Sequence, residues 1–503
     1  MSKQMFSIQE ICELTSGVVV HGDALEGSSA SKEEIVFVSG FSIDSRTLCP
    51  GDLFVAVKGE LSDGHNYVQA AAQKGGVAAL VRSDYKSPCG VLPPNFACIL
   101  VNDPLKGLWE LARENRKRNE HVKMIAVTGS NGKTTTKEML ASVFREAVGD
   151  DRILCNKKSY NNHLGVPLTL MELRPHHEFC VTEIGMNAPG EIKALAELSR
   201  PEVGVITSLG EAHLQGLRTL DNIAAAKSEL FESLSDDGVA VFPEVDEKLM
   251  SILMDAAIHI EEKRKILFGR GEKAQVRLLD SYQEVDGKLF CKLGIDDLEI
   301  NARLPLLGVH NGMNAAATVA AAHAMGVQPE FIKSGLENVT PPPHRSVLLK
   351  IGGARILDDC YNANPPSMRA GLNTLFNLPE VGLVGVIMGD MLELGDSSEK
   401  HHEELGRDIA RRGVDLALFV GEKMRRAAEG AKDAGMDVKK IHLFADAEEA
   451  GEYAAENFGA GWSVLVKGSR RTALEKALET WTVRVGVTSN GSVGGNENSG
   501  GLI

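Results

Sequence analysis

The segment MIAVTGSNGKTTTKEML, from Met124 to Leu140, constrains the fold of this chain more than any other. A short apolar run typical of a buried strand leads into a glycine-bracketed turn, and a helical pattern follows. Gly129 and Gly132 would let the backbone curl so that its N–H groups and the helix N-terminus face an anion. The segment therefore predicts a phosphate-binding loop between a strand and a helix.

The residues around the turn predict how a nucleotide would be held. Lys133 would reach the terminal phosphates, and Thr134 would place a hydroxyl on Mg²⁺. The spacing departs from the common G-x-x-x-x-G-K-[ST] pattern, because Val127 stands where the first glycine is expected. A chance turn is the alternative, but the order of strand, Gly-Lys-Thr and helix favours a nucleotide site. The predicted nucleotide-binding residues are Thr128, Gly129, Ser130, Asn131, Gly132, Lys133, Thr134 and Thr135.

Two other apolar runs end near residues that could complete a metal site. FCVTEIG places Glu183 at the end of a strand, where a carboxylate would suit the oxygen coordination of Mg²⁺. SLGEAHLQGL places His213 just beyond another strand, on the same edge of the sheet. The alternatives are a solvated charge for Glu183 and a surface or core filler for His213. The loop alone does not distinguish hydrolysis, exchange and substrate activation.

Strand and helix patterns alternate along most of the chain, which predicts an α/β protein with doubly wound, mostly parallel sheets. Shorter alternating runs between Lys265 and Leu307 predict a small antiparallel addition to the central sheet. Pro341–Pro343 is typical of a linker. The expected units are an N-terminal α/β domain (1–103), a central phosphate-loop domain (104–338), a C-terminal Rossmann-like domain (339–486) and a disordered Gly/Ser/Asn-rich tail (487–503).

Composition restricts the partners and the compartment. The net charge of −15 over 503 residues argues against non-specific binding to nucleic acid or anionic membranes, which need a basic surface. The eight cysteines are scattered without a C-x-x-C pair, as expected for reduced thiols. The first residues lack the apolar core of a secretory signal, and no segment has the apolar length of a membrane span. We therefore expect a cytoplasmic protein whose cations are concentrated in a pocket.

The combined motifs resemble the Mur ligases, the ATP-dependent amino-acid-adding enzymes of peptidoglycan synthesis. Each motif is weak alone, but the set is specific and extends to near residue 476. The shared motifs are VTGSNGKTTTKEM, the strand ending in Glu183, SLGEAHLQG, AAAKSELFESL, HNGMNAAA and KGSR. Further segments are similar to the branch of the family that adds D-alanyl-D-alanine: SIDSRTLCPGDLFVAVKGELSDGHNY, SYNNHLGVPLTLMEL, EIGMNAPGEI, DDCYNANPPSMRAGL and MGDMLELG.

The sequence departs from the family pattern in two places. His344 precedes Arg345 where the family often has glycine, which leaves the fine role of Arg345 open. Val241 to Glu244 lacks the usual Asn-x-Asp-Asp. Neither departure touches the phosphate loop.

The resemblance implies a reaction and its substrates. The γ-phosphoryl group of ATP would pass to the terminal carboxylate of UDP-N-acetylmuramoyl-tripeptide, and the amino group of D-alanyl-D-alanine would then attack the acyl phosphate. Mg²⁺ would assist, and catalysis would consist mainly of positioning and electrostatic stabilisation. The family tendency is monomeric. The third residue of the tripeptide, meso-diaminopimelate or lysine, is not determined.

The resemblance also implies roles for individual residues. Lys133, His213, Lys227 and Arg345 would be catalytic. Thr134, Glu183, His213 and Lys227 would hold metal, with Lys227 carbamylated. Asn314 would lie against the adenine, and Asp359 would accept from the ribose. The implied substrate-binding residues are Ser45, Arg46 and Thr47 for the uridine diphosphate, Asn162 and His163 for the muramyl peptide, and Asn362, Asn364, Lys467 and Ser469 in the C-terminal domain. Of these, Lys467 and Ser469 are the candidates for recognising the carboxylate of the incoming dipeptide.

Plainer explanations exist for some of these residues, and two other functions compete. Arg46 could be a salt-bridged surface residue, Asn362 and Asn364 could cap or turn the chain, and Lys467 could belong to a simple turn. Folylpolyglutamate synthase is a related ligase, but it normally reaches its phosphate loop within about the first fifty residues, whereas about 120 precede it here, room for a separate domain. A nucleotide switch would need no third domain.

Overall fold

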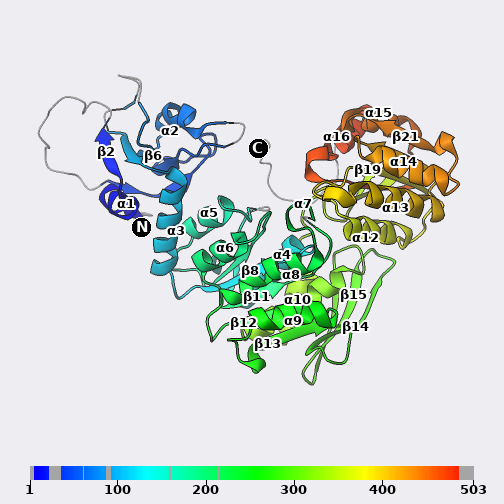
Figure 1. Cartoon of the computed structure of the whole chain (residues 1–503), viewed down its shortest axis with the longest axis horizontal. Coiled ribbons are helices and arrows are strands. Elements are labelled where there is room, and N and C mark those ends of the chain that lie inside the picture. Colours follow the sequence, from blue (N-terminus) through cyan, green and yellow to red (C-terminus); the bar gives the residue numbers. More distant parts are fainter. Residues whose placement is uncertain are drawn as a thin grey trace, which may run out of the picture.

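The computed structural model describes residues 5–21, 36–59, 62–86, 92–93, 95–157, 160–212 and 214–486. His213 and the predicted tail at 487–503 lie outside these residues. The described residues form three larger sheets and one two-stranded ribbon of β1 (Phe6–Ser7) and β3 (Phe37–Val38). Figure 1 shows the N-terminal part and the C-terminal part on opposite sides of the central part.

Within its described segments, the N-terminal sheet has five strands in the order β2-β7-β6-β5-β4. Its strands pair in parallel, except that β2 runs antiparallel to β7. Helices α1 and α2 belong to this part, and no phosphate loop occurs in its described segments. The elements are α1 (Ile8–Thr15), β2 (Val18–His21), β4 (Gly40–Ser42), β5 (Asp52–Val55), α2 (Val68–Gln73), β6 (Ala78–Arg82) and β7 (Ala97–Val101).

Helix α3 (Pro104–Arg118) joins the N-terminal sheet to the central part. It begins after Asp103, whose side chain accepts hydrogen bonds from the first turn, and proline is favoured at the position that follows such a cap. Gly107 passes so close to β6 that an added Cβ would lie 2.7 Å from Leu80 Cδ2. At its other end, Asn115 donates to a backbone carbonyl of the central part. The helix is therefore packed against both parts.

The central sheet has nine strands in the order β16-β15-β14-β13-β12-β11-β8-β10-β9. Pairing is parallel from β9 to β14, and β14, β15 and β16 pair antiparallel, which confirms the predicted antiparallel addition. The strands are β8 (Lys123–Thr128), β9 (Ile153–Cys155), β10 (Phe179–Glu183), β11 (Val203–Ile206), β12 (Val239–Pro243), β13 (Lys265–Gly269), β14 (Val276–Gln283), β15 (Leu289–Ile295) and β16 (Leu298–Leu304). The helices are α4 (Lys133–Val148), α5 (Gly165–Met171), α6 (Glu191–Ser199), α7 (Leu214–Leu217), α8 (Leu220–Glu232), α9 (Glu247–Ala256), α10 (Asn311–Ala324) and α11 (Pro329–Glu337).

Strand β8 lies inside this sheet and is buried on both faces. Met124 and Ala126 belong to the core on the side of α3, whereas Ile125 and Val127 belong to the core on the side of α4 and α10. Side chains alternate between the faces of a strand, so a continuous apolar run is what a strand covered by helices on both faces requires. The chain crosses from one side of β8 to the other between β10 and β11, and such switch points are where open α/β sheets bind ligands.

The C-terminal sheet has six strands in the order β17-β18-β22-β19-β20-β21, all parallel except the edge strand β17. Apolar cores cover both of its faces, as expected for a Rossmann-like unit. The strands are β17 (Val347–Ile351), β18 (Ala354–Asp358), β19 (Leu383–Gly389), β20 (Leu416–Val420), β21 (Ile441–Phe444) and β22 (Trp462–Lys467). The helices are α12 (Pro365–Phe376), α13 (Ser398–Arg411), α14 (Met424–Asp433), α15 (Ala447–Asn457) and α16 (Glu475–Arg484).

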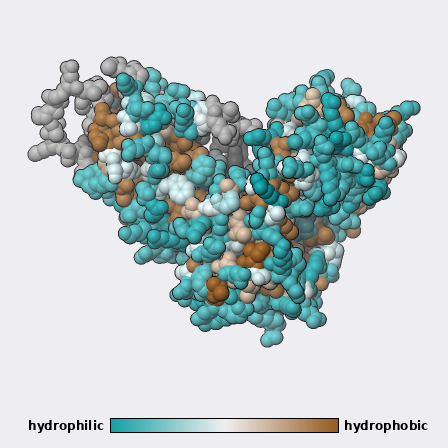
Figure 2. Space-filling model, in the orientation of Figure 1, coloured by the Kyte–Doolittle hydropathy of each residue, from teal (hydrophilic) through white to brown (hydrophobic). Residues whose placement is uncertain are grey.

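The outer surface is mostly hydrophilic, with separate hydrophobic spots, in the view of Figure 2. Among the described helices, none combines the length and the apolar character that crossing a membrane would need. The seven described cysteines are all free thiols, as the sequence predicts.

The close approach of α11 to α4 gives a test of the central packing. A Cβ on Gly335 would lie 2.3 Å from Val143 Cα, so Gly335→Ala must push the two helices apart. We expect a loss of about 1–3 kcal/mol in unfolding free energy, measured by denaturant titration. Lys333→Ala on the exposed side of the same helix is the control and should change little. Equal stability of the two variants would contradict this packing.

Candidate active site between the central and C-terminal sheets

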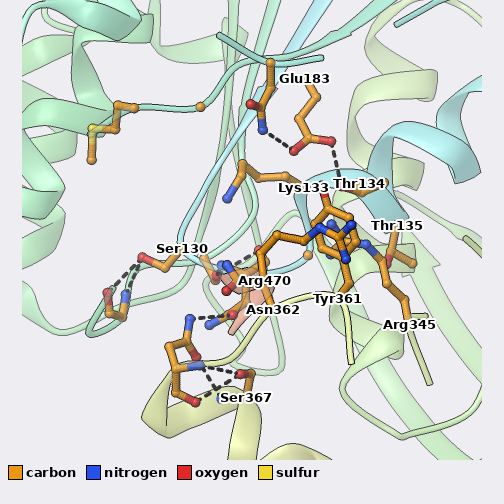
Figure 3. Close-up of a pocket in the computed structure, with 18 of the residues that line it drawn as sticks. Ser130, Lys133, Thr134, Thr135, Glu183, Arg345, Tyr361, Asn362, Ser367 and Arg470 are labelled. Atoms are coloured by element: carbon orange, nitrogen blue, oxygen red, sulfur yellow. Dashed lines mark hydrogen bonds between the residues drawn. The ribbon is translucent and has the colours of Figure 1, made fainter. Parts of the chain in front are cut away.

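A cavity of about 730 Å³ lies between the central and C-terminal parts (Figure 3). Its walls come from the loop after β8, the segments after β10 and β11, the start of α10, and the segments that follow β18 and β22. The sequence-predicted residues that line it are Ser130, Asn131, Gly132, Lys133, Thr134, Thr135, Asn162, His163, Glu183, Asn314, Arg345, Asp359, Asn362, Asn364 and Lys467. The predicted residues Ser130 and Lys467, which are 337 positions apart in the chain, therefore line one cavity.

The β8–α4 loop is held in a shape that only glycine permits at two positions. Gly129 and Gly132 have φ of +147° and +83°. A Cβ on Gly129 would lie 2.0 Å from Thr207 Oγ1, and one on Gly132 would lie 2.2 Å from Asn314 Oδ1. Ser130 Oγ donates to the Gly210 carbonyl at 2.8 Å. The loop is therefore packed against the end of β11 and the start of α10, with the N-terminus of α4 open to the cavity.

Lys133 is half-buried at the start of α4, and its Nζ donates to the carbonyl of Gly129 at 2.8 Å. Burial lowers the pKa of its ammonium, Glu183 acts in the opposite direction, and the charge of Arg345 lowers it further. Two cations and a helix N-terminus thus face the same space, which is an arrangement that a phosphate group would stabilise.

Thr134 and Glu183 form the oxygen-rich corner of the cavity. Thr134 Oγ1 donates to Glu183 Oε2 at 2.6 Å, and Asn161 Nδ2 donates to Glu183 Oε1 at 2.7 Å. Asn156 holds the backbone of Glu183 by accepting from its N–H at 2.9 Å. The carboxylate, almost fully buried, is therefore fixed in place beside the hydroxyl of the phosphate loop.

Lys227 on α8 is 1% exposed and is not among the residues that line the cavity. Within the described part of the chain, no hydrogen bond or ion pair satisfies its ammonium. Burial, reinforced by the charge of Lys133, brings the pKa of Lys227 well below its usual value. An unpaired buried ammonium is costly, so this lysine is stabilised in its neutral form.

The turn 344–346 positions Arg345 from the C-terminal side. His344 and Ser346 both have left-handed backbone, with φ of +58° and +53°. His344 Nδ1 bonds to Asp358 Oδ2 at 2.8 Å, and its carbonyl accepts from Tyr361 N at 3.1 Å. The Arg345 guanidinium lies 4.3 Å from the centre of the Tyr361 ring. Since a non-glycine residue with positive φ is disfavoured, these contacts must hold the turn.

Asp359 is held by Lys467, which comes from the end of β22. Lys467 Nζ donates to Asp359 Oδ2 at 2.5 Å and to the carbonyl of Asn362 at 3.0 Å. Ser346 N donates to Asp359 Oδ1 at 3.1 Å. Lys467 is 3% exposed, and its ammonium is paired with Asp359 inside the C-terminal domain.

A direct hydrogen bond joins the two sides of the cavity. Asn364 caps α12 through its Oδ1, and its Nδ2 donates to Asn131 Oδ1 in the phosphate loop at 2.9 Å. The capping role that the sequence offered as the plainer explanation for Asn364 is thus confirmed, but the amide also reaches across to the phosphate loop.

Asn162 and His163 lie between β9 and α5, at the end of the cavity nearest α3. The side chain of Asn162 accepts from the N–H groups of Leu164 and Gly165. The His163 carbonyl accepts from Trp109 Nε1 of α3 at 2.8 Å. This wall therefore connects the cavity to the helix that leads from the N-terminal sheet.

Several predicted site residues do not line the cavity. Ser45, Arg46 and Thr47 lie after β4 in the N-terminal part, where the exposed Arg46 guanidinium pairs with Asp44 at 2.8 Å. Ser469 is buried and accepts from Leu392 N at 2.9 Å. Thr128 at the end of β8, Gly129 at the start of the loop and Lys227 on α8 are outside the lining, and His213 is outside the described residues.

The structure adds Tyr361 and Arg470 to the cavity wall. Tyr361 lies beside two guanidinium groups, those of Arg345 and Arg470, at 4.3 and 5.8 Å from its ring centre. Both residues occur inside motifs that the sequence singles out, DDCYNANP and KGSR. Sequence reasoning passed over them because nothing local distinguishes them from neighbours such as Lys467 and Ser469.

Comparison with known proteins gives consistent matches over most of the chain. Family models match at 37–95 (Mur ligase family, catalytic domain), 127–322 (Mur ligase middle domain) and 344–470 (Mur ligase, glutamate ligase domain). The UDP-N-acetylmuramoyl-tripeptide–D-alanyl-D-alanine ligase of Bacillus subtilis (strain 168) is 34% identical over 459 residues, covering 91% of this chain and 96% of that protein.

Two solved structures are similar over all or nearly all of their length. MurF from Acinetobacter baumannii has a TM-score of 0.80 at 33% identity and covers 96% of this chain and 100% of its own. MurF ligase from Thermotoga maritima in complex with ADP has a TM-score of 0.73 at 26% identity, covering 89% and 98%.

The His344–Asp358 contact predicts a shifted titration. The hydrogen bond that His344 donates to the Asp358 carboxylate raises the pKa of His344, so the ion pair contributes stability below the ordinary histidine pKa and loses it as pH rises through the raised value. We expect the NMR titration midpoint of His344 to lie above the ordinary histidine pKa and to fall in Asp358→Asn. His442, which bonds to Tyr453 in the same domain, is the internal control. Identical His344 midpoints in both proteins would contradict the pairing.

Proposed function

This chain belongs to the Mur ligase family, and we propose that it uses ATP to join D-alanyl-D-alanine to UDP-N-acetylmuramoyl-tripeptide in the synthesis of peptidoglycan precursors. The observation that carries this proposal is that the phosphate loop and the turn after β18, which contains Asn362 and Asn364, line the same cavity and are joined by a hydrogen bond. A ligase needs the nucleotide and the acceptor in one place, and a nucleotide switch does not.

The reaction has two balanced steps. A carboxylate oxygen of the tripeptide attacks the γ-phosphorus of ATP, the bond to the β–γ bridging oxygen breaks, and ADP leaves. The amino group of D-alanyl-D-alanine then attacks the acyl carbon, the C–O bond to phosphate breaks, and the amine gives up one proton. Both steps gather negative charge around the transferred group. Lys133, Arg345 and the N-terminus of α4 would stabilise that charge.

The residues present suit a Mg²⁺ ion. Thr134 and Glu183 offer a hydroxyl and a carboxylate oxygen that lie 2.6 Å apart, which are ligands of the type Mg²⁺ prefers. The ion would supply neutralisation of phosphate charge. A bare Lys227 ammonium would repel it, but the neutral amine favoured by burial can take up CO₂ to become an anionic carbamate. His213 is expected to join this group.

We assign the remaining predicted residues to parts of the two substrates. Asn314 stands beside the phosphate loop and would contact the adenine, and Asp359 would accept from the ribose hydroxyls. Asn162 and His163 would contact the muramyl peptide at the α3 end of the cavity. In the N-terminal part, Ser45, Arg46 and Thr47 would bind the uridine diphosphate, with Arg46 exchanging Asp44 for a phosphate.

We also propose a cytoplasmic monomer. ATP and a nucleotide-linked substrate are cytoplasmic compounds. Both walls of the cavity come from one chain, so no second copy is needed to complete the site.

The function is tested with purified protein, ATP, Mg²⁺, D-alanyl-D-alanine and each of the two tripeptide substrates, ending in meso-diaminopimelate or in lysine. We expect a product with the mass of the UDP-muramyl-pentapeptide, and ADP release that depends on the dipeptide. ADP release without dipeptide dependence would support a switch. Product formation from folate and glutamate would support a folylpolyglutamate synthase.

Lys133→Ala should reduce ligation by about 10²–10³-fold, because a cation that stabilises the transferred phosphoryl group is lost. Product formation under saturating substrates is the measurement. Lys117→Ala, an exposed lysine on α3, controls for handling and should remain fully active. Near-normal turnover by Lys133→Ala would rule out the assigned role of the phosphate loop.

The carbamate on Lys227 is tested without an activity assay. In ¹³C-bicarbonate the parent protein should show a carbamate carbon resonance, since the neutral amine attacks CO₂, an N–C bond forms and one proton is released. Lys227→Arg keeps a cation that cannot be carbamylated, and it should lack the signal. The same signal in both proteins, or in neither, would refute the modification at this residue.

A further inference from the structure

We propose that Arg470, with the side-chain amide of Asn362, binds the terminal carboxylate of the incoming D-alanyl-D-alanine. This inference rests on the proposed function and names a residue that determines its acceptor specificity. Arg470 follows β22 and lines the cavity, and Figure 3 shows it with Asn362 and Tyr361 at the cavity wall.

Other cations on the cavity wall are already engaged. Of the lysine and arginine side chains that line it in the described residues, Lys133 serves the phosphate loop and Lys467 is buried against Asp359. Arg345 is close enough to Lys133 to lower the pKa of that ammonium, so it faces the phosphate site. Arg470 is the remaining cation, and its side chain is 44% exposed.

The Arg470 guanidinium is oriented by a fixed anchor. One of its terminal nitrogens, Nη1, donates at 2.6 Å to Glu475, whose side chain is 9% exposed. Its Nε and Nη2 donate to no other residue in the described part of the chain. These two nitrogens form one edge of the guanidinium, and two parallel N–H donors match the two oxygens of a carboxylate.

Asn362 offers a further donor from the same wall. Its Oδ1 accepts from the N–H of Ala363 at 2.9 Å, which fixes the orientation of the amide. The Nδ2 group has no partner among the described residues and lies on a cavity-lining side chain. Asn362 directly follows Tyr361 in the chain, and the Arg470 guanidinium lies 5.8 Å from the centre of the Tyr361 ring. A carboxylate held by Arg470 would therefore have a neutral donor nearby.

The length of D-alanyl-D-alanine is consistent with a carboxylate site on the cavity wall that includes Arg470. The dipeptide amine must reach the acyl carbon beside the phosphate loop, and two extended residues span about 7 Å. The far carboxylate would then bind on the cavity wall formed by the C-terminal part, to which Arg470 belongs. Lys467 and Ser469, which the sequence offered for this role, are respectively paired with Asp359 and buried.

The test compares D-alanyl-D-alanine with D-alanyl-D-alaninamide, which keeps the reacting amine and loses the carboxylate charge. The parent enzyme should use the amide about 10–100-fold less efficiently, judged by kcat/KM. Arg470→Gln should lose a similar factor with the dipeptide, chiefly through KM, and change little with the amide, so that the discrimination disappears. Arg470→Lys keeps the charge without the paired donors and should fall between them.

The controls separate specificity from general damage. Arg471→Gln removes the adjacent exposed arginine, which does not line the cavity, and should behave as the parent. Discrimination that survives in both Arg470 variants, or an equal loss with both acceptors, would overturn the inference. A parent enzyme that forms no product with either acceptor would instead overturn the proposed function.

Discussion

The site depends on a loop that has no room for side chains at two of its positions. Thr207 and Asn314 occupy the space where Cβ atoms of Gly129 and Gly132 would lie. This packing turns the N-terminus of α4 into the cavity and presents Asn131 to Asn364. That hydrogen bond joins the C-terminal part to the phosphate loop. The C-terminal part contributes the turn 344–346, the ion pair between Lys467 and Asp359, and the side chains of Arg345 and Arg470 to the cavity.

Electrostatics explains how an acidic chain can bind several anions. The net charge is −15, yet four lysine and arginine side chains line one cavity in the described part of the molecule. Each is oriented by a specific partner, such as Asp359 for Lys467 and Glu475 for Arg470. Because these donors are held before the substrates arrive, little reorganisation is needed when negative charge develops.

The local features could be predicted from the sequence. The phosphate loop is continuous in the chain, and its glycine, lysine and threonine positions follow from strand–loop–helix order. The contact between Thr134 and Glu183 followed from two parallel strands ending at one edge. The alternating α/β pattern and the antiparallel addition were predicted for the same reason, since their periodicities are local.

The features that depend on residues far apart in the chain could not be predicted from the sequence. Lys467 is engaged by Asp359, more than a hundred residues earlier, so its availability was not visible in the KGSR motif. The left-handed turn at His344 is stabilised by Asp358 at the end of β18. Patterns identify which residues can act, but pairing in three dimensions decides which remain free to bind a ligand.

The central claim is that this cavity activates a carboxylate by phosphorylation before the amide forms. It is tested most directly with a tripeptide substrate labelled with ¹⁸O in its terminal carboxylate. The account predicts that each inorganic phosphate released during ligation carries one ¹⁸O atom, because the C–O bond breaks when the amine attacks. Phosphate without the label, or ¹⁸O found in AMP, would contradict it.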